Sequence, residues 1–155
     1  MSTNARATYL AALKMVARRE LSEAQVRQRL ARRGHDPEAV DAAVGRLKGA
    51  RAIDDSRAAE AIARTESSVK RRGRLRVERQ IEGAGIDPAT ARRAVDEVFG
   101  ALDPDALLDA ALARRLGRRT SIADEGEFWR LYRHLIGQGF ESDQIVRALK
   151  ARSVK

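Results

Sequence analysis

The sequence predicts an all-α protein of three tandem three-helix repeats, and two observations support this fold class. First, one pattern occurs three times: an apolar pair four residues apart, a glycine, and then a new apolar stripe. Its glycines, Gly34, Gly85 and Gly139, are 51 and then 54 residues apart. Second, no run of alternating β-branched residues interrupts the helical spacing. A repeat of this period is typical of stacked helical units, so we expect an elongated, curved, right-handed-solenoid-like chain.

Each repeated pattern is expected to form two helices joined by a tight turn. A glycine just after a helix can adopt the left-handed conformation that closes it. Asp36-Pro37 and Asp87-Pro88 then start the next helix, because Asp can cap it and Pro is tolerated at its first position. The third copy has Glu141-Ser142 there, and we expect Ser142 to be the cap. The apolar pairs before the glycines are Val26/Leu30, Val77/Ile81 and Leu131/Leu135.

A further helix is expected before each of these pairs. The predicted spans run from Tyr9 to Arg19, from Arg57 to Val69, and from Asp105 to Arg115, the last begun by Asp103-Pro104. Together the helices divide the chain into repeats over residues 1–50, 51–102 and 103–155.

Composition excludes several classes of protein. The 155 residues contain no cysteine, so neither a disulfide nor thiolate chemistry is expected. No stretch approaches the roughly 20 apolar residues that span a bilayer, and no apolar run follows the amino end. We therefore expect a soluble, cytoplasmic monomer without a membrane partner.

No catalytic constellation stands out, so we predict that the protein is not an enzyme. There is no P-loop, and His35 and His134 lack a second ligand at zinc spacing, so neither a metal nor a cofactor is expected. Asp54-Asp55 could act as an acid–base pair or bind a metal, but adjacent residues rarely face one point. Capping of the next helix is the interpretation we favour.

Basic residues are abundant and clustered. The chain has 31 Lys and Arg against 22 Asp and Glu, a formal net charge of +9 and a pI near 10.9. Such a balance favours a nucleic acid or an acidic protein surface as partner. Coding bias and solvated helix faces paired with Glu are the alternative interpretations. The candidate binding residues are Lys70, Arg71, Arg72, Arg74 and Arg76 in a central run, Arg114, Arg115, Arg118 and Arg119 in a second cluster, and Arg27, Arg32 and Arg33 in a third cluster, which also contains Arg29.

Three aromatic residues lie close together in the third repeat. Phe128 belongs to the apolar stripe of its helix, whereas Trp129 and Tyr132 lie off its centre. Stacking on nucleic-acid bases is one possible role. A place in the core or at a junction between repeats is the interpretation we favour.

Taken in order, several segments resemble the RecX family, bacterial regulators of the RecA recombinase. Ile53-Asp54-Asp55 resembles the family's hydrophobic-Asp-Asp motif, although Ala58 stands where the family has an aromatic residue. The basic run ending in Gly73 resembles its basic-Gly segment. Gly85-Ile86 and Gly139-Phe140 are similar to its two glycine turns.

The resemblance implies a protein that binds the RecA–DNA filament and mainly restrains it. It would limit filament extension or promote disassembly, and so modulate recombination, DNA repair and the SOS response. The implied partners are the RecA filament and single-stranded DNA, with double-stranded DNA as a further candidate. We hypothesise that the central basic run supplies most of the electrostatic contact. The alternative is a helix-turn-helix or non-specific DNA-binding protein that acts without RecA, although the helices after the turns begin with poor base readers such as Glu38-Ala39.

Overall fold

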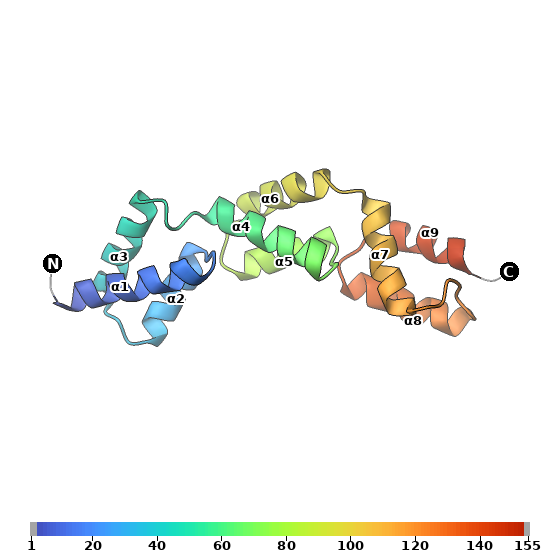
Figure 1. The fold of residues 1–155 in the computed structure, drawn as a ribbon, viewed down its shortest axis with the longest axis horizontal. Helices are drawn as coiled ribbons and strands as arrows, with labels where there is room; N and C mark the ends of the chain where they lie inside the picture. The colour runs from blue at the N-terminus through green and yellow to red at the C-terminus, as the bar shows by residue number, and fades with distance from the viewer. Residues whose placement is uncertain (1–2, 154–155) are drawn as a thin grey trace. The chain divides into compact units, whose positions relative to one another are not determined.

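A computed structural model describes residues 3–153, and these residues confirm the all-α prediction. They form nine α-helices, whose order along the chain can be followed in Figure 1. One isolated β-bridge joins Ile122 and Ser153. A π-helical turn, Thr65–Val69, directly follows α4. The α-helices are α1 (Thr3–Arg18), α2 (Glu23–Arg32), α3 (Pro37–Gly49), α4 (Asp55–Arg64), α5 (Arg74–Gly83), α6 (Pro88–Gly100), α7 (Pro104–Leu116), α8 (Glu125–Gly137) and α9 (Ser142–Arg152).

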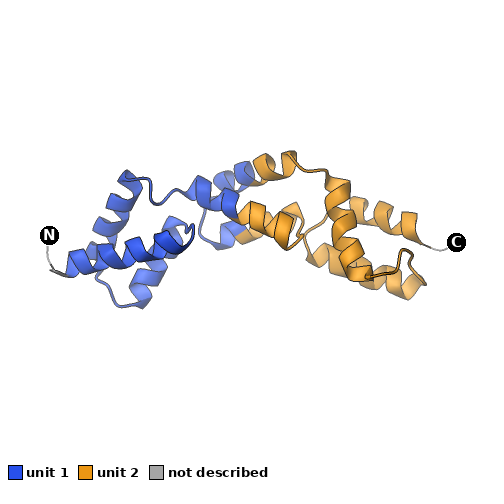
Figure 2. Ribbon diagram, in the orientation of Figure 1, with its two compact units in different colours: residues 1–61, 81–94 blue, residues 62–80, 95–155 orange. Residues whose placement is uncertain are grey.

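The chain divides into two compact units (Figure 2). Unit 1 comprises the chain up to Ala61 together with Ile81–Ala94, and unit 2 comprises Ile62–Gln80 together with the chain from Val95 onward. Helices α4, α5 and α6 are therefore each shared between the units. The division into repeats over residues 1–50, 51–102 and 103–155 stays a prediction, and its two outer limits lie outside the described residues.

Unit 1 is built around the packing of α1 on α3, with α2 in contact with both. Its apolar core contains Met15 and Leu21 as well as residues of the expected stripes of α2 and α3. The guanidinium of Arg46 lies 3.8 Å from the centre of the Tyr9 ring, which is cation–π geometry.

Unit 2 has a separate core, in which α8 packs on α9 and α7 contacts both. Leu112, Leu135, Ile145 and Leu149 are fully buried there, as their helical spacing predicts. Phe140, next to the third glycine, joins the same core.

The three glycine turns adopt the expected left-handed conformation. The φ angles are +84° at Gly34, +82° at Gly85 and +99° at Gly139. Two of the turns also need glycine because of close packing. A Cβ on Gly85 would lie closer than 3.0 Å to Ala24, and one on Gly139 would lie closer than 3.0 Å to the backbone of Arg76. Gly34 has open space around it.

Helix starts agree with the sequence in part. Asp103 accepts hydrogen bonds from the backbone N–H groups of Asp105 and Ala106, and Asp87 accepts one from Thr90. Asp36 is at the N-cap position of α3 but makes no capping bond, because its carboxylate accepts a hydrogen bond from the Asn4 side chain at 2.6 Å instead.

Two expected boundaries are wrong. The N-cap of α9 is Glu141 and not Ser142, whose hydroxyl is 2.8 Å from that of Tyr132 and is already inside the helix. Helix α1 begins at Thr3 rather than Tyr9. Its first turns lack an apolar stripe, and the buried hydroxyl of Thr8 instead hydrogen-bonds with Nδ1 of His35 at 2.7 Å.

Candidate nucleic-acid interface

Two of the predicted basic clusters meet in unit 2, at a pocket of about 510 Å³ that we call the cationic pocket. Lys70, Arg71 and Arg72 line it from the segment that joins the π-helical turn to α5. Arg114 and Arg115 line it from the last turn of α7. No acidic residue is among its lining residues, so five cations share one concave surface. The remaining lining residues are Val69, Ala111, His134 and Gln138.

A buried carboxylate beside the pocket holds two of these cations. Glu66, in the π-helical turn, is only 3% exposed. One of its oxygens is 3.1 Å from Nζ of Lys70, and the other is 2.7 Å from Nη1 of Arg72. The Gln80 amide donates a further hydrogen bond of 2.9 Å to Glu66. The carboxylate is therefore fully engaged on the protein side.

The charge state of Glu66 follows from two opposing effects on its pKa. Burial alone would raise this pKa, because removal from water disfavours the charged form. The hydrogen bonds from Lys70 and Arg72 outweigh burial, and the net pKa lies below the ordinary value of 4.5. Glu66 is therefore an anion at neutral pH and fixes both cations at the pocket wall.

Arg71 has an unusual backbone. Its φ angle is +53°, in the left-handed region that costs about 1–2 kcal/mol for a residue with a Cβ. Backbone hydrogen bonds of the two flanking residues hold Arg71 in this conformation. The N–H of Lys70 donates to the Thr65 carbonyl at 3.2 Å, and the N–H of Arg72 donates to the Glu66 carbonyl at 2.9 Å. Strained residues of this kind are frequent at functional sites, and the described residues contain one other, Arg51 with a φ angle of +58°, which does not line the pocket.

The other three cations of the pocket lack an internal partner. Arg71, Arg114 and Arg115 make no ion pair with any residue between positions 3 and 153, whereas Lys70 and Arg72 pair with Glu66. The only neutral titratable group in the pocket is His134. Its pKa lies below the ordinary value of 6.5 because of burial, with a further contribution from Arg115.

The rest of the central run is placed elsewhere in unit 2. Arg74 forms an ion pair with Asp96, and Nη1 of Arg76 donates to the Gly137 carbonyl at 3.1 Å. Neither residue lines the cationic pocket. Arg119 makes two hydrogen bonds with Glu127, of 3.0 and 2.7 Å, and Arg118 is exposed. The second predicted cluster is thus split between the pocket and an internal ion pair.

The third cluster lies in unit 1 on α2. Arg27 is held between Glu23 at 3.1 Å and Asp41 at 2.5 Å. Arg32 and Arg33 are exposed at the end of the helix, and Arg29 is half-buried. These arginines share a helix, but most of the charge of Arg27 is compensated within the unit.

Asp54 caps the helix that follows it, as the sequence predicted, whereas the carboxylate of Asp55 caps an earlier helix, so the prediction is wrong for Asp55. Asp54 accepts a hydrogen bond of 3.1 Å from the N–H of Arg57 in its own helix. Asp55 accepts one of 2.9 Å from the N–H of Glu23, at the start of α2. The two carboxylates therefore serve two different helices, which explains why they are adjacent without sharing a target.

The aromatic residues of α8 divide between core and surface. Phe128 and Tyr132 pack against the core of unit 2, as expected. Trp129 is 45% exposed, so it does not lie in the core, and a place at a junction between repeats stays a prediction. Its ring meets those of Phe128 and Tyr132 edge to face, at 5.3 and 5.4 Å between centroids.

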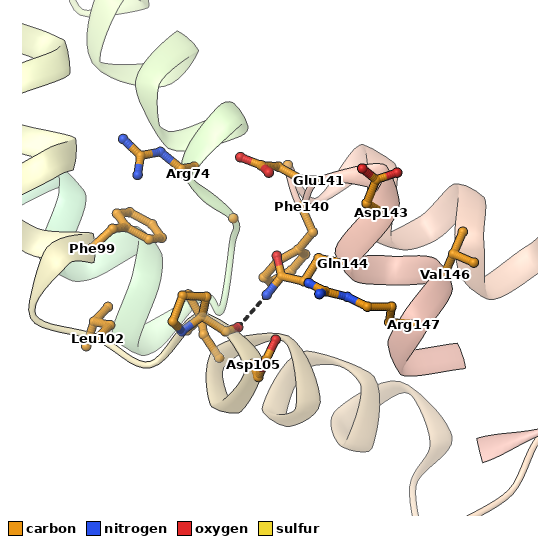
Figure 3. A pocket seen from close by; sticks show the side chains of 14 residues that line it. Arg74, Phe99, Leu102, Asp105, Phe140, Glu141, Asp143, Gln144, Val146 and Arg147 are labelled. Atoms are coloured by element: carbon orange, nitrogen blue, oxygen red, sulfur yellow. Dashed lines mark hydrogen bonds between the residues drawn. The ribbon is translucent and has the colours of Figure 1, made fainter. Parts of the chain in front are cut away.

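Unit 2 has a second, larger pocket of about 790 Å³, shown in Figure 3. Phe99, Leu102 and Phe140 give it apolar walls, and the Gln144 amide donates to the Pro104 carbonyl at 2.7 Å (Figure 3). Its charged groups are mixed in sign, and this makes it a poorer anion site than the cationic pocket. They are Arg74 and Arg147 against Asp105, Glu141 and Asp143.

Sequence reasoning missed the residues that organise the cationic pocket. Glu66 reads as a solvated residue in a polar stretch, and Gln80 and Gln138 carry no pattern. Among residues 3–153 there is no group of three or more side chains that could hold a metal ion. Within the same residues, no helix has the length and apolarity needed to cross a membrane.

The family model and the relatives that this chain matches all carry the name RecX. The family model described as "RecX, first three-helix domain" matches residues 9–47. The regulatory protein RecX of Halorhodospira halophila is 35% identical over 144 residues, covering 91% of this chain and 85% of that protein. The RecX of Stenotrophomonas maltophilia is 30% identical over 139 residues, covering 90% of this chain and 83% of that protein.

A solved structure has the same fold. The crystal structure of RecX from Lactobacillus salivarius superimposes with a TM-score of 0.74 at 19% identity, covering 97% of both chains. At this level of identity the likeness concerns the fold alone.

Proposed function

This chain belongs to the RecX family of regulatory proteins, and from that premise we propose that it binds the RecA–DNA filament and restrains it. In this proposal it limits extension of the filament or promotes its disassembly. Recombination, DNA repair and the SOS response would then respond to its concentration.

The observation that carries the proposal is the convergence of five cations on the cationic pocket of unit 2. The DNA of a nucleoprotein filament carries a regular array of phosphates. Cations that are clustered and unpaired before binding favour phosphate, because binding releases condensed counterions and relieves repulsion among the cations. Arg71, Arg114 and Arg115 meet this description.

DNA-dependent ATP hydrolysis by a bacterial RecA on single-stranded DNA tests the proposal, with this protein titrated in. Restraint of the filament predicts inhibition well below one molecule per RecA subunit. Inhibition that begins only near saturation of the DNA would point to competition for phosphates. No inhibition of the cognate recombinase would contradict the proposal.

A DNA-binding protein that acts without RecA is the second candidate, because the same pocket would serve it. Salt dependence separates the forms of this candidate. Phosphate-driven binding weakens steeply with salt whatever the sequence, with a slope of about −0.7 per phosphate on single strands. A helix-turn-helix protein would instead keep one preferred site.

A further inference from the structure

We propose that the cationic pocket is a phosphate-binding site in which Arg71, Arg114 and Arg115 contact phosphate oxygens. In this site Glu66 is a positioning residue that holds Lys70 and Arg72 at the wall. The inference rests on the proposed function and deepens it, because it names the residues and the chemical group that they recognise.

The first argument is that the five cations differ in whether they form an ion pair within the protein. Two of them share one carboxylate that is 3% exposed, and three have no partner among residues 3–153. Here the unpaired guanidiniums line a concave surface of about 510 Å³ without an acidic residue. Guanidinium presents a planar fork of donors that matches phosphate oxygens, so the free groups are of the type suited to this ligand.

The backbone gives a second argument. The π-helical turn places Glu66 inside, and the left-handed Arg71 follows between two residues whose side chains are fixed to that carboxylate. Both features cost free energy, and π-helical turns and strained residues occur frequently at functional sites. Both features lie in or next to the segment whose three consecutive cations, Lys70, Arg71 and Arg72, line the pocket. We infer that the free energy they cost serves to build this site.

His134 supplies a reporter inside the pocket. His134 lines the pocket together with the five cations, and Arg115 is the charged group that acts on it electrostatically. The nearby carboxylate of Glu66 is paired with Lys70 and Arg72. An anion in the pocket would stabilise the imidazolium and raise the pKa of His134 from its lowered value. His35, the other histidine of the chain, lies in unit 1 beside Thr8 and gives an internal control.

The test measures binding to the protein alone, with no RecA present. The probe is a fluorescent oligo(dT) of about 20 nucleotides, longer than common single-strand site sizes. The pocket variant is Arg71→Gln/Arg114→Gln/Arg115→Gln. The control variant, Arg18→Gln/Arg19→Gln/Arg79→Gln, removes the same charge from exposed arginines that do not line the pocket. We expect about a tenfold or greater loss of affinity in the pocket variant, a salt slope shallower by at least about 0.7, and a clearly smaller loss in the control. Equal losses in the two variants would overturn the site.

Competition identifies the source of the phosphate. Displacement of oligo(dT) by millimolar ATP or inorganic phosphate would mean that the pocket accepts a free phosphate group. Displacement by unlabelled DNA alone would mean that it accepts the diester backbone. Both results support a phosphate site, provided that the bound anion raises the pKa of His134 in an NMR titration and leaves the ring signals of His35 in place. A His134 pKa that does not move with any bound probe would overturn it.

A second variant, Arg71→Gly, separates loss of the cation from loss of folding. Glycine removes the cation and also relieves the left-handed strain, so the variant should be at least as stable as the wild type while it binds oligo(dT) several-fold more weakly. Unchanged affinity with unchanged stability would overturn the role of Arg71.

The outcomes for the site and for the proposed function are separable. If the protein inhibits RecA but its pocket variant still binds phosphate normally, the proposed site is wrong and the proposed function stands. If phosphate binding depends on the pocket but the protein has no effect on RecA, the site stands and the proposed function is wrong.

Discussion

Unit 1 and unit 2 contain corresponding junctions that use different hydrogen-bond donors, a side-chain hydroxyl in unit 1 and a backbone N–H group in unit 2. In unit 1 the turn at Gly85 lies against the start of α2, and the Ser22 hydroxyl donates to the Ala84 carbonyl at 2.5 Å. In unit 2 the turn at Gly139 lies against the start of α5. There the backbone N–H of Gly73, which is 51 residues after Ser22, donates to the Gln138 carbonyl at 2.8 Å.

The same repeat period relates two other pairs of residues. Glu66 and Arg72, the ion pair beside the cationic pocket, are 51 residues after Met15 and Leu21. Met15 and Leu21 are buried in the apolar core of unit 1. A buried ion pair adds less stability than well-packed apolar residues of similar volume. Where residues 15 and 21 pack in an apolar core, the positions 51 residues later carry an ion pair that holds a cation at the pocket wall.

The largest effect is expected from Gly139→Ala in the junction of unit 2. The new Cβ would clash with the Arg76 backbone and also needs a positive φ, so we expect a loss of about 3 kcal/mol or more. Gly34→Ala is the matched control, because it has a similar φ and open space, and should cost only about 1 kcal/mol. Urea unfolding measures both. Equal losses would show that the close approach is unimportant.

Glu66→Gln should come next, with a loss of about 2–3 kcal/mol at pH 7, because Lys70 and Arg72 lose their buried counter-charge. The pKa of Glu66 is lower in the folded protein than the ordinary 4.5, so its contribution is complete above that value and is lost as the pH falls through the folded pKa. The difference in unfolding free energy between wild type and variant should therefore shrink between pH 7 and pH 3. A difference that is independent of pH would contradict this account.

The double change Glu66→Met/Arg72→Leu places the residues of unit 1 at the corresponding positions of unit 2. We expect stability within about 2 kcal/mol of the wild type, or above it, because apolar packing can replace a buried ion pair. Affinity for single-stranded DNA should nevertheless fall. Thermal unfolding and fluorescence anisotropy measure the two quantities. Loss of folding, or unchanged DNA affinity, would break the comparison between the repeats.

The smallest effect is expected at the junction of unit 1. Asp55→Ala removes the carboxylate that accepts from the Glu23 N–H, and loss of a helix cap costs about 1 kcal/mol. DNA affinity should not fall, because Asp55 is not part of the cationic pocket. Urea unfolding and anisotropy test both statements, and weaker DNA binding would contradict the second.

Features set by local sequence were predictable. The glycines of the turns, the stripe of α9 and the caps at Asp54 and Asp87 follow from residues a few positions apart. Asp36 was placed correctly, but its hydrogen bond was not, because its partner Asn4 is 32 residues away.

For the candidate site, the sequence predicted the basic residues but not how they come together. The sequence marks the basic clusters, yet only packing shows that Arg71 meets Arg114 and Arg115 while Arg74 and Arg119 turn to acidic partners. The burial of Glu66 depends on contacts with residues that follow it in the chain. Periodicity cannot show such an arrangement, because a charged residue in a polar stretch usually lies in solvent.

The central claim is that the cationic pocket of unit 2 carries the proposed restraint of the RecA filament. The most direct measurement is RecA ATP hydrolysis on single-stranded DNA, titrated in parallel with the wild type, the pocket variant and the control variant. We predict that the wild type and the control inhibit well below one molecule per RecA subunit, and that the pocket variant has lost most of its inhibition at the same ratio. Inhibition by the pocket variant equal to that of the wild type would contradict the claim.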